Sequence, residues 1–323
     1  MKLEQIGFYT LSDERAKNTS PSSNLKRCEL IITDRCNFSC PYCRGLKKEL
    51  RGDISITDFC KTLGIWVSHG LENIRLSGGE PTLHPYLPVM VELCKTKNIN
   101  RIAISTNGSA DFEQYVQLVR LGMNDVSVSL DACCSSTGDI MAGKTGQYDK
   151  VIKNIGRLAN IVYVTVGVVV TDKNLKEVKD IVETADRLGV ADIRIIPAAQ
   201  YSKCLDDIKI KKSVLDRHPI LKYRVQNHKP VRGLCRTDCK RCYLAMDDMA
   251  VAGNKQFPCI IYMREQGEHI GYVNAEMRGD RIMWVRDHNS IKDPICKNNC
   301  LDVCRDYNNK VDHYVRKNAR KLF

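Results

Sequence analysis

The sequence lacks long hydrophobic runs. No apolar stretch reaches the ~18 residues that a membrane-spanning helix needs, and the longest, residues 161–170, has the length of a strand. The first residues, Met1-Lys2-Leu3-Glu4-Gln5, also lack the apolar core of a signal peptide. We therefore expect a cytoplasmic protein that has no membrane partner.

Cysteine, in contrast, is abundant, with 16 among 323 residues. Disulfide-rich secreted domains are usually short, whereas this chain has room for one large domain and a small one. Its 43% of hydrophobic residues is enough for a proper core. Many of the cysteines recur at intervals of two or three residues, which is typical of metal ligands. These features predict a cytosolic, oxygen-sensitive metalloprotein.

Three of these cysteines, Cys36, Cys40 and Cys43, follow the apolar run 30–32 with the spacing C-x3-C-x2-C. The run reads as a buried strand, so the cysteines are expected on the loop that leaves it. Three thiolates are one too few for a closed zinc or 4Fe–4S site. A 4Fe–4S cluster held by three cysteines keeps one iron free for another ligand. The alternative is a zinc knuckle whose fourth ligand lies elsewhere in the chain.

With the aromatic Tyr42 before its third cysteine, this stretch resembles the radical S-adenosylmethionine (radical SAM) superfamily. The resemblance implies that Cys36, Cys40 and Cys43 hold a catalytic 4Fe–4S cluster. Its free iron binds the amino and carboxylate groups of S-adenosylmethionine. Reductive cleavage of that cofactor then gives methionine and a 5′-deoxyadenosyl radical, which takes hydrogen from an unactivated carbon.

Between residues 27 and 199, strand patterns alternate with amphipathic helix patterns. The predicted strands are 28–32, 73–76, 101–105, 125–130, 161–170 and 192–196. The predicted helices are 57–68, 87–97, 112–121, 148–159 and 175–188. Six such steps imply a parallel sheet with helices on its outer face. We expect an α/β fold, an open partial (β/α)6 TIM barrel of the radical SAM type over residues 27–200, after an N-terminal leader over 1–26.

Polar residues follow the ends of successive predicted strands, where barrels of this type gather their chemistry. By resemblance, these residues and Tyr42 contact the cofactor. The GGE-like segment Gly78-Gly79-Glu80 would bind the amino group of the methionine part of the cofactor. The polar and acidic residues after the third and fourth strands would lie near the ribose and the carboxylate of the cofactor. Lys144 would pair with that carboxylate. Ordinary turns, turn capping and a solvated lysine are the alternatives. The candidates are Ser77, Gly78, Gly79, Glu80, Thr106, Asn107, Ser129, Asp131 and Lys144.

The second half carries another set of cysteines after a basic connector at 201–234. The region 235–323 resembles the cysteine-rich SPASM and twitch extensions of radical SAM enzymes, which implies one or two auxiliary 4Fe–4S clusters. Residues 249–259 read as a hairpin that delivers a ligand. The alternative is a structural zinc held by the first four of these cysteines. The candidate metal ligands are Cys235, Cys239, Cys242, Cys259, Cys296, Cys300 and Cys304.

Other cysteines have less specific signals. Cys133 and Cys134 lie at the predicted mouth, where a thiol can donate a hydrogen atom, ligate a cluster or simply be a buried bystander. Cys28, Cys60 and Cys94 fall within predicted strands and helices and are expected to pack there.

The formal net charge of +12 permits an acidic or nucleic-acid partner without requiring one. We predict a radical SAM enzyme that modifies a peptide or protein and receives its electron from a low-potential flavodoxin or ferredoxin. Modification of a nucleic-acid base or nucleotide is the alternative substrate class. The non-enzymatic alternative is an Fe–S electron carrier or a binding module stabilised by zinc. An electron carrier, however, needs no iron that is free to bind another ligand.

Overall fold

The computed structural model describes residues 13–45, 52–199, 205, 208–226 and 230–317. Within them, one sheet has the strand order β6-β5-β4-β3-β2-β1-β7-β8-β9. Strands β1 to β6 pair in parallel, as expected for a partial (β/α)6 barrel. The strands are β1 (Arg27–Thr33), β2 (Asn73–Gly78), β3 (Arg101–Thr106), β4 (Asp125–Ser129), β5 (Tyr163–Val170), β6 (Asp192–Pro197), β7 (Asp248–Ala252), β8 (Lys255–Phe257) and β9 (Gly271–Tyr272).

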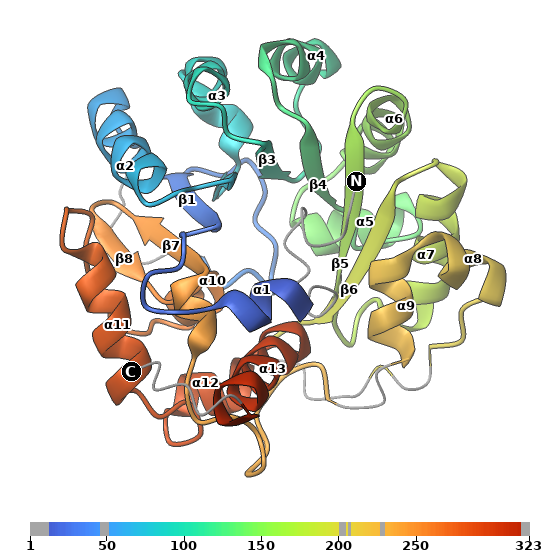
Figure 1. Cartoon of the computed structure of the whole chain (residues 1–323). Helices are drawn as coiled ribbons and strands as arrows, with labels where there is room; N and C mark the ends of the chain where they lie inside the picture. The colour runs from blue at the N-terminus through green and yellow to red at the C-terminus, as the bar shows by residue number, and fades with distance from the viewer. Residues whose placement is uncertain (1–12, 46–51, 200–204, 206–207, 227–229, 318–323) are drawn as a thin grey trace.

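The helices α2, α3, α4, α6 and α7 lie along the outer side of this curved sheet (Figure 1). They match the five predicted helices to within a few residues, and the sequence reading missed the short α5. The first eight α-helices are α1 (Asp13–Asn18), α2 (Ile56–Ser68), α3 (Leu87–Thr96), α4 (Phe112–Leu121), α5 (Ser135–Ala142), α6 (Tyr148–Ala159), α7 (Val178–Arg187) and α8 (Lys212–Arg217). The others are α9 (Pro219–Gln226), α10 (Ile260–Arg264), α11 (Met277–Asp287), α12 (Pro294–Asn299) and α13 (Asp302–Lys317), with 3-10 turns η3 (Pro81–Leu83), η4 (Leu175–Glu177) and η5 (Tyr243–Met246).

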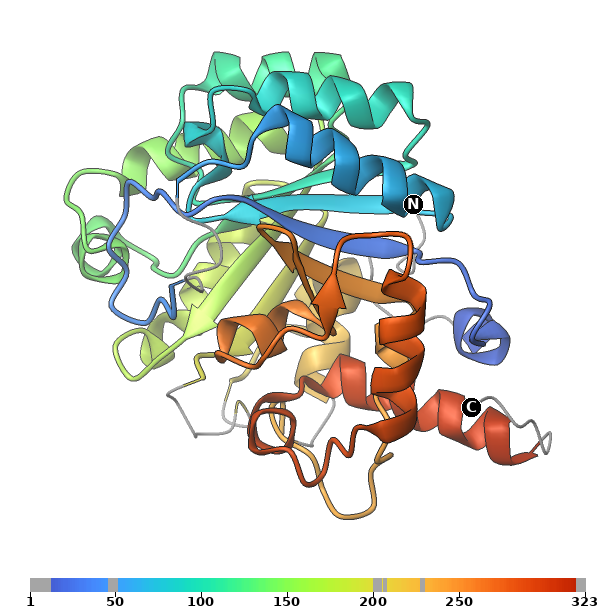
Figure 2. The ribbon, with the colours of Figure 1, turned by 90° about the vertical axis from the view of Figure 1, so that its left-hand side faces the viewer.

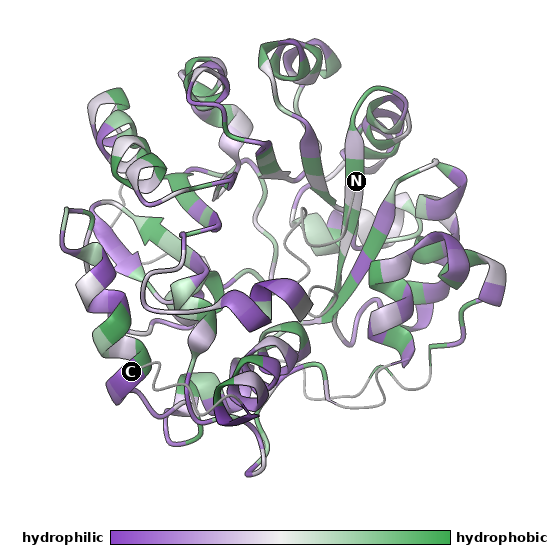
Figure 3. Cartoon of the chain, viewed as in Figure 1, coloured by the Kyte–Doolittle hydropathy of each residue, from purple (hydrophilic) through white to green (hydrophobic). Residues whose placement is uncertain are grey.

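The two faces of the sheet differ in polarity because side chains alternate along each strand. Leu30, Leu76 and Ile104 belong to the main hydrophobic core together with residues of the outer helices. The outer helices carry both hydrophilic and hydrophobic residues, as amphipathic helices on a sheet require (Figure 3). The opposite, inner face carries charge instead, with Glu29 of β1 paired beside Arg75 of β2.

The C-terminal region joins the same sheet. Strand β7 pairs in parallel with β1, so Arg27 lies opposite Asp248 and forms an ion pair with it. Gly253, with a φ of 61°, turns the chain into the antiparallel strand β8, which confirms the predicted hairpin. Helix α11 packs against β9 and η5, α12 packs against α10, and α1 lies beside α13 (Figures 1 and 2). The sheet therefore has three more strands than the six expected, because β7 extends it past β1.

No helix in the described ranges combines the length and apolar character that crossing a membrane requires. This agrees with the absence of long hydrophobic runs in the sequence.

The basic connector is more structured than a solvated linker. Its α9 packs on β6 and buries Ile220 and Leu221. Arg224 of the same helix is also buried and donates a 2.5 Å hydrogen bond to the carboxylate of Asp302, at the start of α13. Part of the connector's positive charge is thus used inside the protein and does not face a partner.

Loss of one member of the Arg224–Asp302 pair should destabilise the fold. Both side chains are at most 1% exposed, so Arg224→Met would leave a buried carboxylate without its counter-charge. We expect the free energy of unfolding to fall by about 3 kcal/mol in anaerobic urea denaturation of the cluster-loaded protein. The matched control is Lys222→Met, whose pair with Asp216 is about half exposed, and it should cost less than about 1 kcal/mol. Equal losses in the two variants would contradict a special role for the buried pair.

Candidate active site

The cysteine loop follows β1 directly, as the sequence predicts. Cys36 and Cys43 are exposed and Cys40 is half-buried, and all three are free thiols. The backbone N–H groups of Phe38 and Gly45 each donate to a thiol sulfur, Cys36 Sγ and Cys43 Sγ, at 3.4 Å. Such donors stabilise negative charge on sulfur, so this loop suits thiolate ligands of a metal cluster.

The two glycines after β2 allow that loop to approach the cysteine loop. The N–H of Gly79 donates to the carbonyl of Thr33 at 2.9 Å, and the N–H of Glu80 donates to the carbonyl of Arg35 at 2.8 Å. A Cβ on Gly78 would overlap the Thr33 carbonyl oxygen, and one on Gly79 would overlap that of Arg35. The glycines are therefore required by backbone contact with the cysteine loop.

The Glu80 carboxylate connects the β2 loop to the β3 loop. It is 1% exposed, and one of its oxygens accepts from the Thr82 N–H, the Thr82 hydroxyl and the Thr106 hydroxyl at 2.7–3.1 Å. The other oxygen accepts from the Asn107 N–H at 2.7 Å. Burial raises the pKa of Glu80, and these donors oppose the rise. Glu80 thus fixes the loop after β2 against the loop after β3, at the end of the barrel where the strands finish. Its contact with the methionine amino group stays a prediction.

Side chains also connect the cysteine loop to the loops after β3 and β4. Asn37 accepts from the Asn107 side-chain amide and donates to Ser109, both at 2.8 Å. The Tyr42 hydroxyl donates to the buried carboxylate of Asp131. Burial raises the pKa of Asp131 to about 6, while the hydrogen bond from Tyr42 lowers it. The structure thus brings together Tyr42, which belongs to the cysteine loop, and Asp131, which follows β4.

The end of α5 forms a further wall of the cysteine loop. The Ser39 N–H donates to the carbonyl of Ala142 at 2.9 Å. Gly143 follows with a φ of 59°, and a Cβ there would overlap the Ser39 carbonyl oxygen. Of the remaining candidates, Ser129 ends β4 and Lys144 follows α5; both are exposed. Their predicted cofactor contacts stay predictions.

The spacing of the thiols distinguishes a cluster from a single ion. A tetrahedral zinc with ~2.3 Å bonds to sulfur holds its ligands about 3.8 Å apart. Two groups of three potential ligands in the described part of the chain have ligand atoms within 4.8 Å of one another, and neither is Cys36, Cys40 and Cys43. The same is true of the four cysteines of the structural-zinc alternative. Neither set of thiols is therefore arranged around a single ion in this structure.

Six of the seven C-terminal cysteines line one pocket, and burial raises the pKa of each of their thiols. Buried thiols in such a group suit metal ligation, which removes their protons. Cys235 is exposed and does not line the pocket. The lining cysteines are Cys239, Cys242, Cys259, Cys296, Cys300 and Cys304.

A histidine that the sequence reading missed lies at this pocket. His288 Nε2 is 3.5 Å from Cys296 Sγ, and its ring stacks on Trp284 with centroids 3.7 Å apart. Asp293 completes the group and caps α12 by accepting from the Cys296 N–H. No sequence motif surrounds His288, so the sequence could not indicate that it lies beside Cys296. His288 gives the pocket one possible metal ligand that is not a cysteine.

Comparisons with known proteins agree with this geometry. Residues 30–185 match the family model described as the Radical SAM superfamily. This match covers just under half of the chain and, with the curated relatives described next, indicates an enzyme of the radical SAM class. The match confirms the predicted fold, the 4Fe–4S cluster and S-adenosylmethionine, and the cysteine-rich C-terminal region is consistent with a SPASM or twitch extension.

Two curated relatives are GTP 3′,8-cyclases. The mitochondrial enzyme of Arabidopsis thaliana is 28% identical over 62% of this chain and 54% of its own length. That of Clostridium acetobutylicum is 30% identical over 61% of this chain and 65% of its own length. The chain thus spans less than two thirds of either relative.

Solved structures share the fold at low identity. Streptococcus suis SuiB bound to S-adenosylmethionine superposes with a TM-score of 0.59 at 16% identity, covering 82% of this chain and 66% of that one. At this identity the likeness concerns the fold alone.

The close contact at Gly79 gives a test of the site. Gly79→Ala would push its Cβ into the Arg35 carbonyl and displace the cysteine loop. We expect reconstituted protein to lose about four iron atoms per chain, the content of one cluster, while the C-terminal iron stays. Anaerobic iron and sulfide analysis measures this. Gly64→Ala in α2, where a Cβ meets nothing within 4 Å, is the control and should keep its iron. Full iron in Gly79→Ala would show that the contact does not position the loop.

Proposed function

We propose that this enzyme abstracts a hydrogen atom from an anionic substrate of the nucleotide class, bound on the inner face of the barrel. When bound, the cluster and S-adenosylmethionine supply the chemistry, which is reductive cleavage to methionine and a hydrogen-abstracting 5′-deoxyadenosyl radical. Cys36, Cys40 and Cys43 hold the cluster. The surrounding loops position the cofactor and keep water away from it.

The observation that carries the substrate class is the charge on the inner face of the sheet. In closed TIM barrels this space is filled by bulky apolar side chains. Here Arg75 projects from β2 and Arg194 from β6, with Glu29 of β1 near both. Burial, together with the nearby positive charge of Arg75, lowers the pKa of Arg194 to about 9. The inner face is therefore a polar interior that suits a charged ligand.

The carboxylates around these arginines have partners of their own. Asp125 pairs with Arg101, and Asp248 pairs with Arg27. Asp192 accepts from the first N–H groups of α9. Among the described residues, neither Arg75 nor Arg194 has a carboxylate within ion-pair distance, and each has a buried Nε without a hydrogen-bond acceptor. Among the described residues of this face, the guanidinium groups of Arg75 and Arg194 thus stand outside any ion pair, with the carboxylate of Glu29 nearby.

Guanidinium groups bind phosphate through paired hydrogen bonds. The named substrate of the curated cyclase relatives, GTP, has this chemistry, which supports a phosphorylated ligand for the present enzyme. The basic connector contributes less to this proposal, because Arg224 is buried in its own ion pair.

Peptide modification, the leading expectation from the sequence, is the second candidate. The observation that favours it is the C-terminal cysteine pocket, which resembles the extensions of peptide-modifying enzymes. One matching structure is that of SuiB bound to its precursor peptide. In either case we propose a flavodoxin or ferredoxin as the electron donor.

Radical chemistry is tested by the product 5′-deoxyadenosine. Anaerobically reconstituted protein with dithionite and S-adenosylmethionine should form it, and a Cys36→Ala, Cys40→Ala, Cys43→Ala variant should not. The variant should lose about four iron atoms and keep those of the C-terminal pocket. Chromatographic quantification of 5′-deoxyadenosine, together with iron and sulfide analysis, measures both effects. Zinc in place of iron after anaerobic isolation would contradict the proposal.

The inner arginines are tested by binding of GTP, the probe, to the protein loaded with clusters and S-adenosylmethionine. Each of Arg75→Met and Arg194→Met should weaken binding at least tenfold, because a hydrogen bond to a charged group contributes about 1.5–3 kcal/mol. Anaerobic equilibrium dialysis measures the affinity. Arg157→Met is the control, since this exposed residue on α6 lies against Phe112 outside the barrel. Equal binding by all variants, or none by the wild type, would favour the peptide class.

A further inference from the structure

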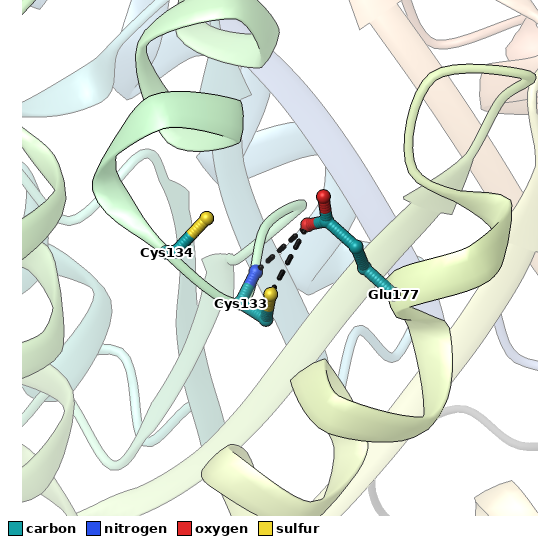
Figure 4. Close-up of side chains that lie close together, drawn as sticks. All are labelled: Cys133, Cys134 and Glu177. Carbon is teal, nitrogen blue, oxygen red and sulfur yellow. Dashed lines mark hydrogen bonds between the residues drawn. The ribbon is translucent and has the colours of Figure 1, made fainter.

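Cys133, Cys134 and Glu177 form a compact group outside the predicted cofactor ligands. Cys133 and Cys134 follow β4, and Cys134 is the N-cap of α5. Glu177 comes from η4, after β5. Figure 4 shows the carboxylate of Glu177 directed toward Cys133, with the Cys134 side chain beside it. One ligand atom from each residue lies within 4.8 Å of the other two.

This spacing fits a single ion. Bonds of ~2.3 Å to sulfur and ~2.0 Å to oxygen place tetrahedral ligand atoms about 3.5–3.8 Å apart. The separations of at most 4.8 Å between the three ligand atoms are close to this range. A 4Fe–4S cluster spreads its thiolates over several iron atoms and needs a wider arrangement. The group therefore differs in kind from Cys36, Cys40 and Cys43, which are not held at this spacing.

Neighbouring groups already orient the carboxylate. Glu177 Oε2 accepts from both the N–H and the thiol of Cys133 at 3.3 Å. Its other oxygen accepts from the Thr137 hydroxyl at 2.5 Å. When an ion binds, the Cys133 proton leaves and Oε2 becomes a ligand, while Thr137 still holds the second oxygen. Hydrogen bonds of this kind orient the ligands in protein metal sites.

We propose that Cys133, Cys134 and Glu177 bind one thiophilic divalent ion, for which Zn²⁺ is the best match. Two thiolates and one carboxylate are ligands that zinc accepts, and a water molecule completes a tetrahedron. Thiol protons go to solvent, and no electron is transferred.

The ion joins the loop after β4 to η4 at the mouth of the barrel. It sits two residues beyond Asp131, which accepts from Tyr42, and at the opposite end of α5 from the Ala142 carbonyl that holds Ser39. The site therefore supports the wall against which the cysteine loop packs. This role is separate from the chemistry of the iron–sulfur clusters.

The test measures zinc in cluster-loaded protein, so that the iron-binding cysteines are occupied. Each sample is equilibrated anaerobically with one equivalent of ZnCl₂, separated from free metal by gel filtration, and analysed for zinc and iron by mass spectrometry. Wild-type protein should retain about one zinc per chain. Cys134→Ser and Glu177→Gln should each reduce the zinc affinity at least tenfold. Cys60→Ser, which removes an exposed thiol on α2, is the matched control and should retain the metal.

Zinc-edge X-ray absorption identifies the ligands independently of activity. The proposal expects two sulfur neighbours at ~2.3 Å and oxygen neighbours at ~2.0 Å. Four sulfur neighbours would place the metal in the C-terminal pocket and overturn the proposal. Unchanged zinc retention in Cys134→Ser and Glu177→Gln would overturn it as well. An iron content equal to that of wild type shows that these variants are folded, so a loss of zinc alone supports the site.

Discussion

The mouth of the barrel depends on the buried carboxylate of Glu80. It receives four hydrogen bonds from two elements, the β2 loop and the start of the β3 loop. Without these donors a buried carboxylate would cost several kcal/mol, so the loops must adopt the conformation that supplies them. Asn107, whose N–H is one donor, uses its side chain to bind Asn37 in the cysteine loop. The position of the predicted cluster ligands thus depends on an acidic residue whose hydrogen bonds all go to other groups.

The polarity of the sheet explains how one fold combines a stable hydrophobic core with a charged inner face. Apolar residues such as Leu30 and Ile104 pack against the helices and supply the hydrophobic core. The inner face contributes little to that core and holds Arg75, Arg194 and Glu29 instead. The strands β7, β8 and β9 and helix α13 extend the structure beyond β1. The apolar side chains that stabilise the fold are therefore buried away from the charged inner face, where we propose that the substrate binds.

Local sequence patterns were sufficient for the six barrel strands, the five outer helices and the order of the polar residues that follow the strands. The cysteine spacing and the glycines after β2 carry their meaning within a few neighbouring residues, and the helical repeats located all five outer helices. Contacts between residues that are far apart in the sequence could not be predicted from these patterns. The parallel pairing of β7 with β1, the approach of His288 to Cys296 and that of Glu177 to Cys133 join positions that no local pattern connects. Helix α5 was missed because it is short and has only one buried residue, Met141.

Helix α10 connects the two cysteine-rich regions. Its N-cap is Cys259, which lines the C-terminal pocket, and it ends five residues later at Arg264. Arg264 donates to the carbonyl of Gly78 at 3.3 Å and to that of Gly45 at 3.4 Å, and Glu265 pairs with Arg44 of the cysteine loop. At 1.5 Å per residue this helix is only about 8 Å long. Helix α10 and Glu265 therefore form a short connection between the C-terminal pocket and the backbone beside Cys43.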